Sequence, residues 1–189
     1  MSKKSERQLS KDNLRTETQI GRNIRVAKIG FSRVEKIHKS YSVDALDTRQ
    51  AEHLFHLMAN AERIHAKYSA ETERHATLLL WDEQIAKIAR RFSRDMSTSK
   101  AFNLALSDGT AMQSRLSKAG IKWSSFGVNL GLFSGYALAA HVAFMREQPY
   151  RRNHRANILN PRFTRFGAGV ILSRGVFYVC EIFLEPAQN

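Results

Sequence analysis

Apolar residues recur at helical spacing in two segments of the chain. The first segment begins near Thr48 or Ala51, and its apolar side chains are three or four positions apart, as one side of a helix requires. They are Leu54, Phe55, Leu57, Met58, Ala61, Ile64 and Tyr68. The second segment follows Trp81-Asp82-Glu83, and its apolar stripe consists of Ile85, Ile88, Ala89, Phe92 and Met96, with Lys87, Arg90, Arg91 and Arg94 on the outside. We therefore expect two amphipathic helices, each of which buries its apolar face.

The middle of the chain carries weaker local signals. Ser107-Asp108-Gly109-Thr110 is a turn sequence, and it predicts a third helix over roughly 111–119 that Gly120 ends. Residues 124–135 are rich in Ser and Gly, which favours a loop with a short strand. Residues 136–146 are helical and apolar enough to be buried on most sides. A polar, basic loop follows over residues 147–154.

The end of the chain changes from a helical to a strand pattern. Residues 166–173 and 176–184 are rich in β-branched and aromatic side chains, and Ser173-Arg174-Gly175 between them can form the turn of an antiparallel hairpin. The single cysteine, Cys180, is in phase with the apolar residues of the second strand, so we expect it to be buried in the sheet. Helices packed around a small antiparallel sheet make the expected fold class α+β.

Residues 1–50 are interpreted as a basic N-terminal arm, partly disordered with a short helix around 31–38, and residues 51–189 as the folded domain. Charged residues stand at the N-terminus where a signal peptide needs an apolar segment, so we expect no export signal there. No apolar stretch has transmembrane length. We expect a monomer.

The net charge of +13 favours an anionic partner. Arg151, Arg152 and Arg155 lie in the 147–154 loop or directly after it, and guanidinium groups bind phosphate, sulfate or carboxylate through paired hydrogen bonds. The alternative is a solvated loop whose arginines contact nearby carboxylates or carbonyls. Nucleic acid is the less favoured partner because the loop offers only Tyr150 for base stacking.

A block of residues near the end of the chain resembles a known family. Asn153-His154-Arg155-Ala156-Asn157-Ile158-Leu159-Asn160-Pro161, followed by Gly167-Ala168-Gly169-Val170, is similar to the "Gly-His-Arg-Ala-Asn-Ile-Leu, then Gly-Val-Gly" block of the CAP superfamily, in its bacterial SCP-like branch. This superfamily contains cysteine-rich secretory proteins, antigen 5 and plant pathogenesis-related proteins. Asn60-Ala61-Glu62-Arg63 resembles its "Asn-x-x-Arg" signature, and Leu79-Leu80-Trp81-Asp82 its second-helix pattern. The resemblance covers about residues 52–186 and implies an α-β-α sandwich.

The resemblance also implies a central cleft with two His and two acidic residues, which bind a divalent metal in several members. His154 matches one family His, whereas Leu104 stands where the other is expected. Gly127-Val128-Asn129 matches the family's "Gly-Glu-Asn", so Asn129 is retained and Val128 replaces the carboxylate. Glu147 lies three residues after Phe144, as the remaining acidic residue would, but the span from Phe144 to His154 is about four residues longer than usual. Glu147 therefore points either into the cleft or into solvent.

Leu104 and Val128 cannot serve as metal ligands, acids or bases. We therefore expect no tight metal site and no cofactor, and interpret the chain as a non-catalytic module that binds a protein, glycan or lipid through its loops and basic surface. A carrier of sterols or fatty acids is one alternative, since an apolar cleft suits such ligands. A divergent metal-dependent hydrolase that uses His154 is the other. The resemblance implies an exported protein, which the charged N-terminus does not support.

Overall fold

The structure is a computed structural model that describes residues 47–75, 77–99, 111–134 and 137–188. All of them belong to the compact unit Val43–Asn189. Nearly all of the predicted arm, the turn at 107–110 and Leu104 lie outside the described residues.

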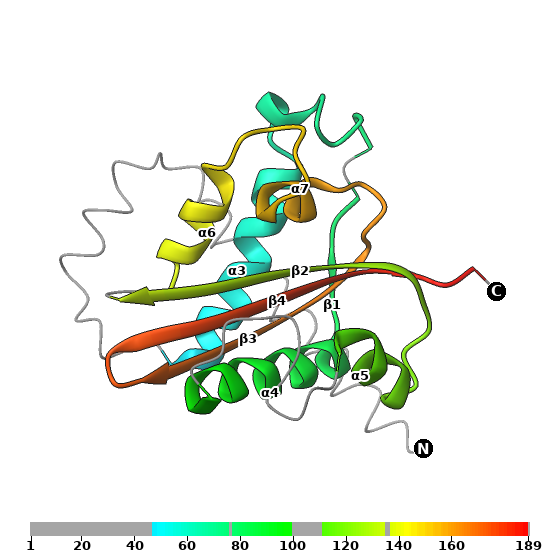
Figure 1. Ribbon diagram of the computed structural model, residues 1–189. Coiled ribbons are helices and arrows are strands. Elements are labelled where there is room, and N and C mark those ends of the chain that lie inside the picture. Colours follow the sequence, from blue (N-terminus) through cyan, green and yellow to red (C-terminus); the bar gives the residue numbers. More distant parts are fainter. Residues whose placement is uncertain (1–46, 76, 100–110, 135–136, 189) are drawn as a thin grey trace, which may run out of the picture. The chain divides into compact units, whose positions relative to one another are not determined.

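A four-stranded mixed sheet forms the middle of this unit (Figure 1). Its strands are β1 (Leu80–Trp81), β2 (Trp123–Ser134), β3 (Arg165–Ser173) and β4 (Val176–Pro186), in the order β1-β3-β4-β2. β3 and β4 form the predicted hairpin, and its two turn residues, Arg174 and Gly175, have φ angles of 51° and 77°, as a tight type I′ turn requires. The expected antiparallel sheet is corrected in one respect, because β1 pairs in parallel with β3.

Helices cover both faces of the sheet (Figure 1). One face packs against α3 (Thr48–Arg63), α6 (Ala139–Met145) and α7 (His154–Leu159), and the other against α4 (Glu83–Ser99) and α5 (Met112–Lys118). A short 3₁₀ helix, η2 (Ala66–Tyr68), follows α3. Each face has its own apolar core, and Cys180 is fully buried in the core beneath α4. The arrangement confirms the α-β-α sandwich.

The predicted second helix is α4, and two glycines bring it close to β3. Asp82 caps the helix, since its Oδ1 accepts hydrogen bonds from the backbone N–H groups of Gln84 and Ile85 at 2.8 and 3.1 Å. A Cβ atom on Gly167 would lie 2.3 Å from the backbone nitrogen of Ala86, and one on Gly169 would lie 2.2 Å from that of Arg90. The glycines of this strand therefore let the helix backbone rest directly on the sheet.

The loop expected over residues 124–135 is wrong, because most of this segment is the long strand β2. β2 pairs with β4 from Trp123 to Ser134. Its glycines fit places without room for a side chain: a Cβ on Gly127 would lie 2.6 Å from Asn157 Oδ1, and one on Gly131 would lie 2.3 Å from the ring of Phe133 and 3.2 Å from Phe144. The Gly content thus reflects close packing against α7, α6 and a ring of β2 itself.

The buried face of α3 also differs from the prediction. The helix ends at Arg63, and its buried residues are Ala51, Glu52, Phe55, Ala59, Glu62 and Arg63. Leu54, Leu57 and Met58 are only half-buried. The predicted apolar face is therefore shifted, and three charged side chains lie in the interior.

Glu52 and Arg90 form a buried ion pair between the two helical layers. Arg90 Nη2 lies 2.7 Å from Glu52 Oε2, and Glu52 Oε1 also accepts the backbone N–H of Val170 at 3.2 Å. Among the described residues, β1 pairs with β3 only as far as Phe166, and no strand pairs with β3 beside Val170 on that side. Burial lowers the pKa of Arg90, but the hydrogen bonds that it donates to Glu52 and Glu83 outweigh this effect and raise the pKa overall.

Arg63 ties the end of α3 to the segments before β1 and after α7. Its guanidinium group donates five hydrogen bonds, of 2.7 to 3.2 Å, to four carbonyl oxygens and one hydroxyl. The acceptors belong to Thr77, Ile158, Asn160 and Phe163. Burial lowers the pKa of Arg63 to about 10, so the side chain remains charged at neutral pH.

Candidate functional site

The candidate site lies where α6, the following loop and α7 meet the end of β2. Asn153 caps α7: its side chain accepts a hydrogen bond from the backbone N–H of Ala156 at 2.9 Å. The Asn153 Nδ2 group donates to the carbonyl of Gln148 at 2.8 Å. Within the same loop Tyr150 has a φ of 58°, in the left-handed region that tight turns use. These local contacts place His154 at the first position of α7.

Glu147 and His154 contact each other at two points. Glu147 Oε1 lies 2.6 Å from His154 Nδ1, and Glu147 Oε2 accepts the backbone N–H of His154 at 2.8 Å. The imidazole ring stacks on Phe144, with 4.4 Å between ring centres. Both side chains are about one-third exposed, at 34% and 32%. Glu147 therefore faces His154 while remaining partly exposed.

A buried polar network lies beneath His154. Asn129 Nδ2 donates to Glu181 Oε2 at 2.9 Å and to the carbonyl of His154 at 3.2 Å. Asn157 donates in turn to Asn129 Oδ1 at 2.8 Å. Glu181 is fully buried, and burial raises its pKa despite nearby His141, Asn129 and His154. Asn129 therefore connects the backbone of the site to a buried carboxyl group.

His141 of α6 is also fully buried in this region. Its Nε2 lies 3.9 Å from Glu62 Oε1, and within the described part of the chain neither ring nitrogen has a hydrogen-bond partner. Burial raises the pKa of Glu62, but His141 offsets this effect and the pKa is lowered overall. Sequence analysis missed His141 and Glu181. The signal for Glu181 was a carboxyl group at an inward-facing position of an apolar strand.

The other predicted site residues lie apart from His154 or are already engaged. Val128 directs its side chain to the opposite face of β2, against the core under α4, while its carbonyl accepts a weak hydrogen bond from Asn157 at 3.3 Å. Arg155 pairs with Glu71 at 2.6 Å, donates to the carbonyl of Met145 and lies over the ring of Tyr68. Arg151 and Arg152 are exposed. The structure thus brings together His154, Glu147 and Asn129.

A shallow apolar hollow of about 370 Å³ opens beside His154. Apart from Glu147 and His154, its lining consists of Leu130, Gly131, Leu132, Phe133, Ala143 and Phe144.

Within the described ranges, no three His, Cys, Asp or Glu side chains converge in a way that could hold a metal ion. In that same part of the chain no helix is both long and apolar enough to span a bilayer.

Comparison with known proteins identifies the family. Residues 57–182, more than half of the chain, match the model of the cysteine-rich secretory protein family, CAP. The chain belongs to the CAP family. A search of curated proteins found no match. In this CAP domain the "Asn-x-x-Arg" signature has a structural explanation, since Asn60 exchanges two hydrogen bonds with the backbone of Leu79 and Arg63 makes the five bonds described above.

Several solved structures share the CAP fold. An extracellular protein with an SCP domain from Bacillus anthracis is 23% identical with a TM-score of 0.57, and the match covers 73% of this chain and 41% of that one. An outer surface protein from Borrelia burgdorferi is 16% identical with a TM-score of 0.56, covering 75% and 97%. A cysteine-rich secretory protein from Staphylococcus aureus is 16% identical with a TM-score of 0.52, covering 75% and 40%. The matched part of this chain thus spans about two fifths of the Bacillus and Staphylococcus proteins.

Proposed function

We propose that this CAP domain is a non-catalytic binding module. The observation that carries the proposal is the contact between His154 and Glu147. The ring nitrogen Nδ1 and both carboxylate oxygens are used within the pair, and the ring is held against Phe144. These groups therefore fix the shape of the α6–α7 loop, and the surrounding surface remains for contact with a ligand.

The hydrolase alternative needs a nucleophile or a metal-bound water next to His154. His154 and Glu147 supply two donor side chains, whereas catalytic zinc sites use three protein ligands. Val128 adds no donor, and its side chain lies on the other face of β2. A metal at this site would also have to break the 2.6 Å contact between Glu147 and His154 Nδ1, or bind through Nε2 alone.

Zinc titration followed by calorimetry tests the proposal, with His154→Ala as the matched control. We expect no saturable binding of zinc at submicromolar concentration by either protein. Binding at a single submicromolar site that disappears in H154A would overturn the proposal and favour the hydrolase.

The apolar hollow beside His154 supports a second candidate, a carrier of a small apolar ligand. Most of its lining is apolar, and Leu132 within it is 43% exposed. Native mass spectrometry of the protein purified from its own host tests this function. A retained lipid that is absent from Leu132→Glu would support the carrier, and a ligand-free spectrum in both proteins would contradict it.

A further inference from the structure

β2 forms one edge of the sheet, because β4 alone pairs with it among the described residues (Figure 1). Successive residues of a strand direct their backbone groups to opposite sides. Val128 faces outward, since its carbonyl accepts a hydrogen bond from Asn157 at 3.3 Å. Leu130, Leu132 and Ser134 are in the same phase, so their backbone N–H and C=O groups also point away from β4.

The β3–β4 hairpin gives the same phase independently. Val170 directs its N–H out to Glu52, so its partner Val179 directs its own backbone groups toward β2. Val179 is paired with Gly131, which therefore bonds to β4. The residues on either side of Gly131 must then face outward.

Side chains from α3 and α7 cover several other outward-facing backbone groups of the sheet. The covered positions are Leu79, just before β1, by Asn60; Val170 on β3, by Glu52; and Val128 on β2, by Asn157. In the described part of the chain, no group binds the outward N–H and C=O of Leu130 or Leu132. This stretch of β2 is therefore an open sheet edge.

The apolar hollow beside His154 runs along the open edge. Four successive residues of β2, from Leu130 to Phe133, line it. Neighbouring side chains of a strand point to opposite faces, so a hollow lined by four residues in a row lies at the edge of the strand. Ala143 and Phe144 of α6 complete its apolar lining. Unpaired backbone groups and an apolar wall thus lie side by side.

An extended peptide uses both of these features. Its backbone can pair with Leu130 and Leu132 as a further strand, while alternate side chains pack against Phe133 and Phe144. Residues 130–134 span roughly 17 Å at about 3.4 Å per residue, so they match about five residues of a partner strand. A small apolar ligand would contact the wall and leave the backbone groups without partners.

The charges around the hollow favour an acidic segment. Arg146 directly follows α6, and Arg151 and Arg152 lie on the loop that leads to His154. All three are exposed, and within the described ranges none has an ion-pair partner. Glu147 also lines the hollow, but both of its carboxylate oxygens contact His154. The net charge of +13 disfavours a second copy of the chain, because the same cations of both copies would approach each other.

We propose that the outer edge of β2, from Leu130 to Ser134, binds an extended, acidic segment of a partner protein as an added strand. The inference rests on the proposed binding function and names its surface, the class of partner and the mode of contact. Backbone pairing supplies the affinity, and the hollow and the exposed arginines select the side chains of the segment.

The probe is a phage library of random peptides of about ten residues, long enough to cover the open edge, selected on the full chain. The most enriched peptide is then made with a fluorescent label and titrated by anisotropy. We expect enriched sequences to carry apolar residues at alternate positions and Asp or Glu beside them. No enrichment, or enrichment of peptides without this pattern, overturns the proposal.

Two variants at one position test the backbone contact. Leu132→Pro removes an outward N–H, and proline at such an edge position leaves the pairing with β4 intact. Leu132→Ala is the matched control, since it shortens the side chain but keeps both backbone groups. We expect L132P to lose at least about tenfold in affinity for the peptide and L132A at most about threefold. Equal losses overturn the proposal.

Peptides with methylated backbone nitrogens test the same contact on the unchanged protein, so this result does not depend on the folding of L132P. Methyl groups at alternate positions block either the N–H groups that face β2 or those that face away. We expect one pattern to lose at least about tenfold in affinity and the other at most about threefold. Equal affinities of the two methylated peptides overturn the proposal.

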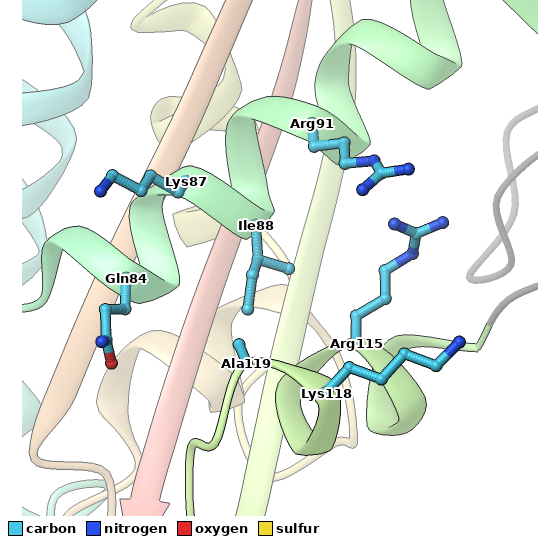
Figure 2. Close-up of a pocket in the computed structure, with 7 residues that line it drawn as sticks. All are labelled: Gln84, Lys87, Ile88, Arg91, Arg115, Lys118 and Ala119. Carbon is cyan, nitrogen blue, oxygen red and sulfur yellow. The ribbon is translucent and has the colours of Figure 1, made fainter.

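A pair of double variants tests the acidic character of the segment. Arg151→Glu with Arg152→Glu reverses two charges beside the hollow. Lys87→Glu with Arg91→Glu makes the same change on exposed residues of α4, on the other face of the sheet (Figure 2). We expect a loss of at least about fivefold in the first variant and at most about twofold in the second, since salt screens distant charges. Equal losses overturn the choice of an acidic segment.

Sedimentation of the parent protein and L132P tests the remaining occupant, a second copy of the chain. We expect both to be monomers. A dimer of the parent protein that dissociates in L132P assigns the edge to a second copy and overturns the proposal. Failure of the proposed function appears instead in the zinc titration, so the two outcomes are read in different measurements.

Discussion

The carboxylate of Glu147 holds His154 by both its ring and its backbone, at 2.6 and 2.8 Å. The two residues are seven positions apart in the chain, and the contact closes the loop between α6 and α7. The ring is thereby fixed at the edge of the apolar hollow rather than left free to turn.

Replacing Glu147 with Ala should lower the free energy of unfolding by about 1 kcal/mol, because a partly exposed charged contact and a hydrogen bond to the α7 backbone are lost. Urea unfolding measures the change. Glu147→Gln is the matched control, since an amide oxygen can still accept the backbone N–H, and it should cost less. Equal stability of the Ala variant and the parent protein would contradict the structural role.

Loss of the Arg63 side chain should strongly lower the free energy of unfolding. Arg63→Met removes five hydrogen bonds and leaves buried carbonyl groups without a donor, so we expect a loss of roughly 3 kcal/mol or more. Arg162→Met is the control, because its ion pair with Glu185 is 67% exposed on the Arg162 side, and it should cost less than about 1 kcal/mol. Similar unfolding midpoints for the two variants would count against this role.

The buried carboxyl group of Glu181 should make the free energy of unfolding fall as pH rises. Its pKa is raised by burial above the ordinary value of 4.5, so the folded protein holds the proton more tightly than the unfolded chain. The stabilisation from this group is present below the unfolded pKa and is lost as pH rises through the folded pKa. Glu181→Gln keeps an acceptor for Asn129 without a charge, and should be the more stable protein at pH 7 by roughly 1 kcal/mol.

Chemical unfolding of Glu181→Gln and the parent protein at a series of pH values checks this expectation. The difference in stability should shrink toward zero near pH 4. A constant difference over the whole range would mean that the carboxyl group does not titrate differently in the folded state.

Adding even a methyl group at Gly167 should destabilise the fold. In Gly167→Ala the new Cβ would lie 2.3 Å from the backbone of α4, which cannot move without the rest of the helix, so we expect a loss of about 3 kcal/mol. Gly175→Ala is the comparison: it has open space but a φ of 77°, and should cost only about 1 kcal/mol. Thermal unfolding separates the two, and a smaller effect at Gly167 than at Gly175 would contradict the close approach of α4.

Elements with a one-sided apolar pattern could be predicted from the sequence. The apolar stripe of α4 and the turn residues Arg174-Gly175 predict their own structures from nearby residues alone. The block around His154 indicates the family. β2 could not be found in the same way, because its face toward α7 carries Gly127, Asn129 and Gly131 in place of apolar side chains. What makes it a strand is its pairing with β4, which lies some fifty residues away in the sequence.

Only part of the candidate site could be predicted from the sequence. His154 stands in a recognisable motif, but the direction of Glu147 depends on the path of a loop whose length departs from the family pattern. The buried charges of α3 were missed because each depends on a distant partner. Glu52 becomes a buried residue only through Arg90, and Arg63 only through carbonyl groups almost one hundred residues away.

The pair formed by Glu52 and Arg90 has a consequence for how the domain comes apart. It joins the two helical layers beside Val170 of β3. Detachment of α4 would leave the buried Glu52 carboxylate without its cation, which costs several kcal/mol, whereas Arg90 would keep Glu83 of its own helix. Amide hydrogens of α3 and α4 should therefore exchange with solvent in one concerted opening, and the two cores, although separated by a sheet, should behave as a single cooperative unit.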